Sequence, residues 1–249
     1  MERHELLARL HQTLRPRNYL EIGVDRGDSL ALSRVPSIGI DPAFSVVHEL
    51  NTDVQLVRAT SDDYFSVNNP TKRLGDNPLD FVFIDGMHLA EFAVRDFIYV
   101  EAYSAPTSVI VFDDMLPRNS VEAARQRQSV AWTGDVFKVT TILKSLRPDL
   151  VVLEVDTSPT GTVVVLRPDG ASARLVENYP AIEAAILQEQ DPQEPPESVI
   201  RRTEAVDPVE LLACSWWAIL IEEREGSLPA GSLTAALAAQ DWAQLRSRG

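Results

Sequence analysis

The stretch Tyr19-Leu-Glu-Ile-Gly-Val-Asp-Arg-Gly-Asp-Ser29 decides the fold class of this chain. It begins as a short apolar strand and passes into a turn that contains Gly23 and Gly27. Glycine permits a tight turn that lets the backbone approach a ligand closely. The Gly-x-x-x-Gly spacing differs from the Gly-x-Gly-x-x-Gly of dinucleotide sites. It therefore favours a nucleoside that carries an amino acid, although a strand–turn–helix junction with purely structural glycines would look the same.

Further short apolar runs follow this stretch and alternate with helical or loop segments. The runs are Ser37–Ile40, Val54–Arg58, Leu79–Ile84 and Ser108–Phe112. Strands that read as continuous apolar runs are buried on both faces, as in a parallel sheet covered by helices. The alternation predicts an α/β fold, a Rossmann-like doubly wound and mostly parallel sheet.

The end of the sheet is predicted to be antiparallel. Val151–Val155 and Thr162–Arg167 are two strands joined by a short turn with proline and glycine. A parallel crossover needs a dozen residues or more, so these strands must form a hairpin. Dehydrogenase Rossmann domains lack such a terminal hairpin, and this disfavours a nicotinamide-dependent oxidoreductase.

The residues beyond the hairpin differ in character, so we expect one domain over 1–170 and an acidic, helical C-terminal extension over 171–249. Asp207 is a predicted N-cap with Pro208 at the first helical position, and the helix should run to about Glu225. Its middle is apolar nearly all round and must be buried. This helix could be buried against the rest of this chain. It could instead form a homodimer contact near Trp216.

Composition excludes several classes of function. The formal net charge is −14, whereas a nucleic-acid surface needs an excess of lysine and arginine. A single cysteine permits no internal disulfide. The first residues lack the apolar stretch of a signal peptide, and the longest apolar run is too short to span a bilayer. We therefore expect a cytoplasmic protein that binds neither nucleic acid nor membrane.

Acidic residues stand at the ends of the first three strands. Glu21 is placed to meet the ammonium group of an amino-acid-bearing nucleoside, directly or through water. Asp41, which follows the second strand, is placed to accept hydrogen bonds from both ribose hydroxyls. Asp62, after the third strand, could accept from the adenine amino group, or could merely cap a helix, as could Asp41.

Together these motifs resemble a class I, S-adenosylmethionine-dependent methyltransferase. The resemblance rests on Leu20-Glu-Ile-Gly-Val-x-x-Gly-x-Ser29, Gly39-Ile-Asp41, Phe83-Ile-Asp85-Gly-x-His88 and Val111-Phe-Asp113-Asp114, and it covers roughly residues 5–168. More narrowly, the chain is similar to small bacterial O-methyltransferase-like domains with an Asp-Gly-x-His strand end. The resemblance implies S-adenosylmethionine as cofactor. The predicted cofactor residues are Glu21, Gly23, Gly27, Ser29, Asp41, Asp62 and Asp85.

The ends of the fourth and fifth strands predict a metal site. Asp85, Asp113 and Asp114 should converge there, and they repel one another unless a cation or proton lies among them. Oxygen ligands suit Mg²⁺ or another hard divalent ion. In the catechol-type enzymes that this end of the site resembles, a basic residue three positions after the first acid removes the acceptor's proton. That position is His88, and we expect His88 and Asp85 to be catalytic.

The sequence departs from the catechol-type pattern, with histidine where lysine is usual and Asp114 where an amide is usual. Macrolide sugar O-methyltransferases, which this end of the site also resembles, tolerate both changes. The sequence therefore predicts O-methylation of a small hydroxylated acceptor with a divalent metal. A metal-independent methyltransferase, whose aspartates only cap helices, is the enzymatic alternative. A non-catalytic or regulatory protein that binds the cofactor or a protein partner is the alternative from another class.

Overall fold

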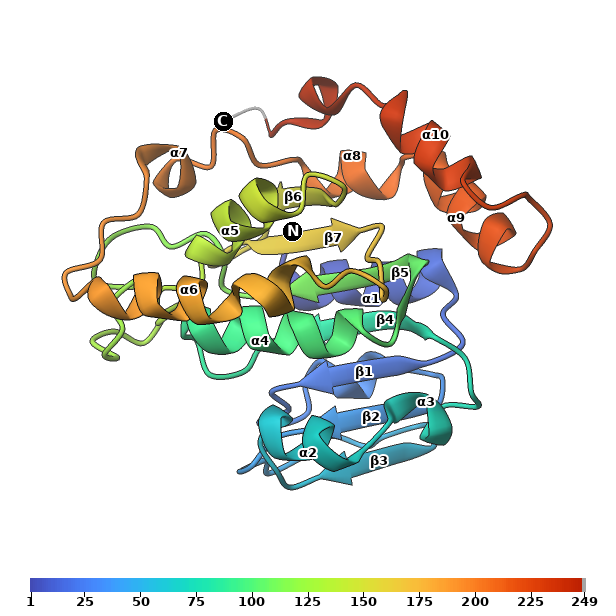
Figure 1. Cartoon of the computed structure of the whole chain (residues 1–249), viewed down its shortest axis with the longest axis horizontal. Coiled ribbons are helices and arrows are strands. Elements are labelled where there is room, and N and C mark those ends of the chain that lie inside the picture. The colour runs from blue at the N-terminus through green and yellow to red at the C-terminus, as the bar shows by residue number, and fades with distance from the viewer. Residues whose placement is uncertain (248–249) are drawn as a thin grey trace.

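Seven strands form one mixed sheet at the centre of the molecule (Figure 1). The computed structural model describes residues 1–247. The strand order is β3-β2-β1-β4-β5-β7-β6. Strands β1 to β5 are parallel, whereas β7 runs antiparallel to β5 and β6. The strands are β1 (Tyr19–Ile22), β2 (Ser37–Ile40), β3 (Val54–Val57), β4 (Leu79–Ile84), β5 (Ser104–Phe112), β6 (Val151–Val155) and β7 (Thr162–Leu166).

The predicted strands and their arrangement are confirmed. Strands β1, β2, β4 and β7 are buried at every residue, as expected for runs covered on both faces. The main difference is β5, which begins at Ser104 rather than Ser108. Ser108 donates its side-chain hydroxyl to the backbone carbonyl of Leu79, so the two strands remain joined across a register shift.

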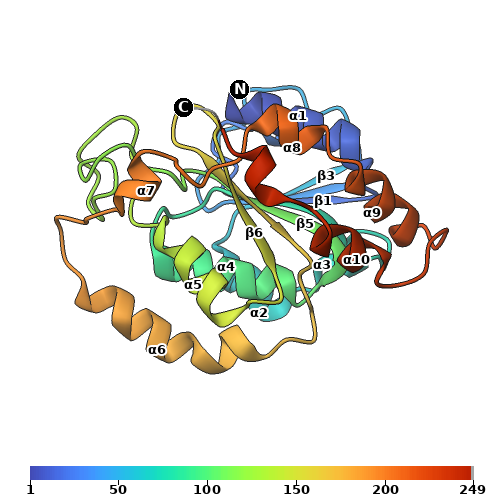
Figure 2. The same cartoon turned by 90° about the horizontal axis from the view of Figure 1, so that it is seen from above.

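Helices cover both faces of the sheet (Figure 2). One face carries α2, α4, α5 and α6, and the other carries α1, α8, α9 and α10. The helices are α1 (Arg3–Leu14), α2 (Ser61–Val67), α3 (Pro70–Arg73), α4 (Ala90–Glu101), α5 (Lys138–Leu146), α6 (Arg174–Gln188), α7 (Glu197–Ile200), α8 (Pro208–Leu212), α9 (Trp216–Arg224) and α10 (Ser232–Ala238). Two short 3₁₀ helices span Leu30–Leu32 and Trp242–Leu245.

The long helix expected from Asp207 to about Glu225 is wrong, because it is broken into α8 and α9. Asp207 does cap α8, since its carboxylate accepts from the backbone N–H of Val209 and Glu210. The indole N–H of Trp217 then donates to the carbonyl of Leu211 at 2.8 Å. A continuous helix would use that carbonyl for its own ladder. The indole thus takes the place of the next helical turn.

The apolar helix is buried on this chain. Trp216 and Trp217 are 2% and 3% exposed and pack with Leu6 and Leu10 of α1 in one hydrophobic cluster. Burying an aromatic side chain of this size stabilises the fold by roughly 3 kcal/mol. These two side chains are therefore covered by this chain, while the homodimer expected near Trp216 stays a prediction. Among residues 1–247, no helix is both long and apolar enough to cross a membrane.

Candidate active site

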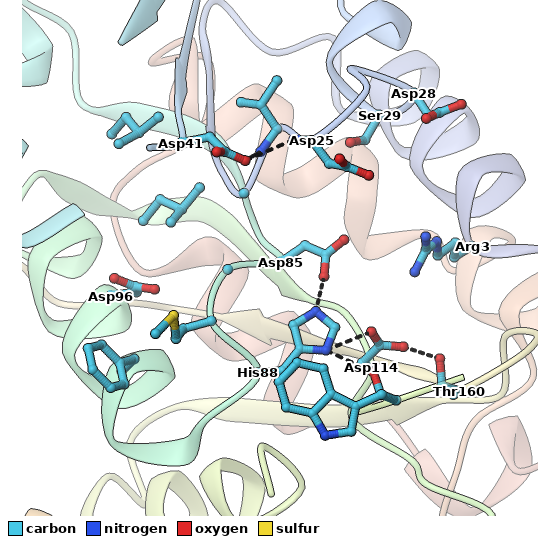
Figure 3. Close-up of a pocket in the computed structure, with 18 of the residues that line it drawn as sticks. Arg3, Asp25, Asp28, Ser29, Asp41, Asp85, His88, Asp96, Asp114 and Thr160 are labelled. Carbon is cyan, nitrogen blue, oxygen red and sulfur yellow. Dashed lines mark hydrogen bonds and ion pairs between the residues drawn. The ribbon is translucent and has the colours of Figure 1, made fainter. Parts of the chain in front are cut away.

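A pocket of about 860 Å³ opens at the carboxyl ends of the parallel strands. Loops that leave neighbouring parallel strands meet at this edge, where ligands bind in open α/β sheets. The loops after β1, β2, β3, β4 and β5 all line it, together with the start of α1 and the turn between β6 and β7. Figure 3 shows the side chains that face this space.

The turn after β1 brings the backbone against the β4 strand end. Gly23 has φ +88°, and a Cβ atom there would lie 1.9 Å from the carbonyl oxygen of Asp85. The N–H of Gly23 donates to the carbonyl of Ile40 on β2 at 2.9 Å. Gly27 also has a positive φ, +79°. The expected glycine turn is therefore present. Gly23 lines the pocket, whereas Gly27 packs against Val46 and does not, and contact of the turn with a cofactor stays a prediction.

Glu21 lies behind the pocket wall rather than on it. It is fully buried, and its carboxylate accepts from the Tyr19 hydroxyl at 2.6 Å and the Ser29 hydroxyl at 2.8 Å. Ser29 lines the pocket, whereas Glu21 is not among the lining residues. Any effect of Glu21 on a bound ammonium would pass through Ser29. Burial raises the pKa of Glu21 to about 8, and the two hydrogen bonds only partly oppose it.

This raised pKa makes a stability prediction. Between its ordinary value of 4.5 and about 8, the folded state keeps a proton on Glu21 that the unfolded chain releases. The unfolding free energy contributed by Glu21 is therefore complete below pH 4.5 and is lost as the pH rises to 8. Glu21→Gln cannot ionise, so it should gain on the order of 4 kcal/mol relative to the parent chain between pH 5 and pH 8.

Urea unfolding of both chains at the two pH values measures this difference. Other groups titrate in both chains equally, so only the difference between their profiles is used. Parallel pH profiles for the parent and Glu21→Gln would show that Glu21 is ionised in the folded protein.

Asp41 lines the pocket at the end of β2, but part of its carboxylate is already occupied. One oxygen accepts from the backbone N–H of Val24 and Asp25 at 2.9 Å each, and the other from that of Ala43 at 2.6 Å. A carboxylate can accept about four hydrogen bonds. Asp41 therefore fixes the turn after β1 and keeps about one lone pair for a ribose hydroxyl.

Asp62 lines the pocket too, yet its carboxylate is held by Arg95. The guanidinium of Arg95 donates to both oxygens of Asp62, at 2.7 and 2.6 Å, and the Tyr99 hydroxyl donates to one of them at 3.0 Å. Arg95 also donates to the hydroxyl of Tyr179 on α6 at 2.9 Å. The C-terminal extension is thus tied to the loop after β3.

Asp85, His88 and Asp114 form the densest group of ionisable side chains in the pocket. One potential ligand atom from each lies within 4.8 Å of the others. His88 Nε2 is 3.1 Å from Asp85 Oδ1, and His88 Nδ1 is 3.4 Å from Asp114 Oδ2. Figure 3 shows the chain of contacts from Asp85 through His88 and Asp114 to the Thr160 hydroxyl, which donates to Asp114.

The surroundings of His88 favour its charged form. Burial alone would lower its pKa, but the hydrogen bond to Asp85 and the charges of Asp85 and Asp114 raise the pKa to about 9. His88 Nδ1 also lies 2.9 Å from the carbonyl oxygen of Trp132. A backbone carbonyl only accepts, so Nδ1 carries a hydrogen and Nε2 is the nitrogen that can exchange a proton. The Trp132 ring stacks on the imidazole at 5.1 Å and 17°.

Asp113 lies apart from this group, which differs from the predicted set of metal ligands. Its carboxylate pairs with the guanidinium of Arg3 on α1, and Asp113 is not a pocket-lining residue. Burial beside Asp85 and Asp114 raises the pKa of Asp113, and Arg3 opposes the shift. Strand β5 ends at Phe112 and Asp114 has a left-handed backbone with φ +59°, so the chain turns after Asp113 and the two side chains enter different surroundings.

The first turn of α1 belongs to the site, and the motif analysis missed it. Glu2, Arg3 and His4 line the pocket, and the backbone N–H of Arg3 donates to the carbonyl of Ser158 at 3.2 Å. The Arg3–Asp113 pair joins residues far apart in the sequence, so no local pattern could have indicated it. Thr160, from the turn between β6 and β7, was missed for the same reason.

The loop after β5 covers one side of the pocket. Trp132 lines the pocket, whereas Arg118 pairs with Glu122 and is not a lining residue. Arg125 holds the loop down through the buried carboxylates of Glu91 and Asp135, at 2.6 Å each. The covering segment is therefore anchored by ion pairs.

Comparison with known proteins gives a family model and several similar folds. Residues 20–115 match a family model described as a methyltransferase domain. No curated protein matches the chain. An O-methyltransferase of tomaymycin synthesis from Streptomyces achromogenes, solved with S-adenosylmethionine, has a TM-score of 0.51 and 22% identity over 66% of this chain and 78% of that one.

Two further solved structures are similar. Cofactor-bound Rv0187 from MTB has a TM-score of 0.51 and 17% identity over 67% of this chain and 79% of that one. An O-methyltransferase from Bacillus cereus, in complex with S-adenosylhomocysteine, has a TM-score of 0.48 and 18% identity over 66% of this chain and 80% of that one. At these identities the likeness concerns the fold.

Proposed function

We propose that this chain, which has a class I methyltransferase fold, is an S-adenosylmethionine-dependent O-methyltransferase that acts on a small hydroxylated metabolite with the help of a divalent cation. The fold and the match to a methyltransferase domain agree with the resemblance drawn from the sequence. The narrower likeness to domains with an Asp-Gly-x-His strand end stays a prediction.

The observation that carries this proposal is the group Asp85, His88 and Asp114 at one end of the nucleoside-sized pocket. A methyl acceptor must lie beside the sulfonium carbon, and this group adjoins the glycine turn through the contact of Gly23 with Asp85. Proton removal from a hydroxyl acceptor therefore has a candidate base, His88, at the place where the acceptor oxygen would arrive.

The residues fit a hard divalent cation. Asp85 and Asp114 offer carboxylate oxygens on both sides of the His88 ring, and Thr160 and Trp132 hold Asp114 and His88 in place from outside. Such outer contacts orient metal ligands in known sites. The carboxylates of Asp85 and Asp114 place two negative charges beside the His88 ring, 3.1 and 3.4 Å from its nitrogens. Asp85 and Asp114 would hold the ion, which lowers the pKa of a coordinated hydroxyl.

In this arrangement each residue has a separate task. Asp85 accepts from His88 Nε2 and orients the imidazole, while the Trp132 carbonyl fixes the hydrogen on Nδ1. A cation held by Asp85 and Asp114 would offset their negative charges and so disfavour the charged imidazole; Nε2 would then lose its hydrogen and could accept the acceptor's proton. S-adenosylmethionine, when bound, would supply the methyl group to the deprotonated acceptor oxygen, with S-adenosylhomocysteine as the leaving group.

A radiolabelled methyl-transfer assay with a panel of phenols, catechols and sugars tests the proposal. We expect turnover that a chelator abolishes and Mg²⁺ restores. His88→Ala should lower kcat by about 10²- to 10⁴-fold, the usual contribution of a general base, while S-adenosylhomocysteine still binds. If His88→Ala kept full activity on every accepted substrate, His88 would not be the general base.

A metal-independent methyltransferase is the second candidate, and the contacts of His88 favour it. The contacts with Asp85 and Asp114 engage both ring nitrogens, so protein groups alone orient the imidazole. Turnover that survives the chelator and is lost in His88→Ala would select this candidate.

A further inference from the structure

The α4 end of the pocket holds a buried carboxyl group that none of the roles above uses. Asp96 is 3% exposed and still lines the pocket. Its Oδ1 accepts a hydrogen bond from the Ser61 hydroxyl, and within residues 1–247 no hydrogen bond reaches Oδ2. Oδ2 therefore faces the pocket with its capacity to accept hydrogen bonds unused, and a donor group of a ligand could bind to it. Burial raises the pKa of Asp96 to about 7.

Gly86 leaves this oxygen uncovered. Its φ is not positive, so the backbone there does not demand glycine. A Cβ atom at residue 86 would lie 3.4 Å from Asp96 Oδ2. Any longer side chain would therefore come between Asp96 and the pocket, and glycine keeps the carboxyl group accessible to a ligand.

The surroundings of Asp96 suit a flat heterocycle with a polar edge. Apolar side chains from three elements line this end: Ile40 of β2, Met87 of the loop after β4, and Phe92 of α4. Asp41, the predicted ribose residue, lies at the neighbouring strand end. Figure 3 shows Asp96 on one side of Asp85 and Arg3 on the other, so the base and the methyl acceptor would take opposite ends of the pocket.

The residue that the sequence offered for the adenine amino group is less well placed. Both oxygens of Asp62 already accept from Arg95, and one of them also accepts from Tyr99. The lone pair that remains is on Oδ2, and a base amino group bound there would have to share that oxygen with the Arg95 guanidinium, whose charge-assisted bond is the stronger. Asp96 Oδ2 carries no such cost.

We infer that Asp96 is the residue that selects adenine, with Oδ2 accepting a hydrogen bond from the exocyclic amino group of the cofactor's base. This inference rests on the proposed function. Above about pH 8 Asp96 is mostly ionised, so a purine with a carbonyl in place of the amino group would set two acceptor oxygens against each other and should be rejected; the titrations below are therefore made above that pH. A polar site of this kind discriminates strongly, because a mismatched ligand leaves its groups unpaired.

Calorimetric titration with two probes tests the inference on the full chain. The probes are S-adenosylhomocysteine and S-inosylhomocysteine, in which a carbonyl oxygen replaces the amino group. The parent chain should prefer the adenosyl probe by at least about 10-fold. Asp96→Leu removes the acceptor while keeping the volume, and should bind the adenosyl probe about 10- to 100-fold more weakly and lose most of the preference.

Two further variants separate recognition from folding. Asp96→Asn retains only one oxygen, which the Ser61 hydroxyl uses, so its NH2 group would face the base and should reverse the preference toward the inosyl probe. Asp62→Asn, the matched control in the neighbouring loop, should keep the preference for the adenosyl probe. The ratio of the two affinities does not depend on the fraction of folded protein, so a merely structural role for Asp96 would leave the ratio unchanged.

The outcomes are distinct. An unchanged ratio in Asp96→Leu, with the parent chain binding and preferring the adenosyl probe, overturns the role of Asp96 and leaves the proposed function standing. If Asp62→Asn instead lost the preference for the adenosyl probe, Asp62 would be the residue that recognises adenine. A parent chain that binds neither probe overturns the proposed function, and the inference with it.

Discussion

Asp114→Asn should weaken Mn²⁺ binding by about 100-fold or more, because loss of a ligand costs more than the 10- to 100-fold typical of changes outside the ligand shell. Mn²⁺ serves as the probe because it accepts the same oxygen ligands as Mg²⁺. Asp114 lines the pocket and faces His88 Nδ1 at 3.4 Å, so its carboxylate is available to an ion.

Asp113→Asn is the matched control for this change, and it should alter Mn²⁺ affinity by less than about 10-fold. The two residues are adjacent and both buried, but Asp113 is paired with Arg3 outside the group. Calorimetric titration with Mn²⁺ compares the variants. An equal loss of Mn²⁺ affinity in both variants would mean that Asp113 is also a metal ligand. Unchanged Mn²⁺ affinity in both would mean that Asp114 does not bind the metal.

Gly23→Ala should cost about 3 kcal/mol or more of unfolding free energy and abolish measurable S-adenosylhomocysteine binding. The new methyl group would lie 1.9 Å from the carbonyl oxygen of Asp85, a backbone atom that cannot turn aside. Relief of the clash requires the β1 turn and the β4 strand end to separate. Both Gly23 and Asp85 line the pocket, so this movement would distort it.

Gly226→Ala isolates the cost of the clash. Gly226 also has a positive φ, +77°, but nothing lies within 4 Å of a Cβ atom placed there. This variant should lose only the roughly 1–2 kcal/mol of left-handed backbone strain and should keep cofactor binding. Urea unfolding and calorimetry measure both effects. Similar losses in the two variants would mean that the β1 turn is not packed against Asp85 as described.

The fold was predictable because its signals are local. Continuous apolar runs such as Leu79–Ile84 identify buried parallel strands, and the short turn before Thr162 leaves only an antiparallel hairpin. The break between α8 and α9 escaped prediction because a single side chain, the indole of Trp217, ends the helix by binding the Leu211 carbonyl. Propensity alone does not register such a competing bond.

The sequence predicted which strand ends form the candidate site, but it did not predict which residues pair with each other there. Asp85, His88 and Asp114 meet as the topology requires. The partners of the carboxylates were not predictable, because they come from distant segments. Arg3 binds Asp113, and Arg95 binds Asp62, so two acids that looked free are occupied.

The most direct test of the central claim is a calorimetric titration of the full chain with S-adenosylhomocysteine, with and without Mg²⁺. A pocket of about 860 Å³ that brings together Ser29, Asp41 and the glycine turn should give one binding site per chain, with similar affinity in both conditions. If S-adenosylhomocysteine produces no binding heat and no thermal stabilisation in either condition, the pocket is not a cofactor site and the methyl-transfer assignment is contradicted.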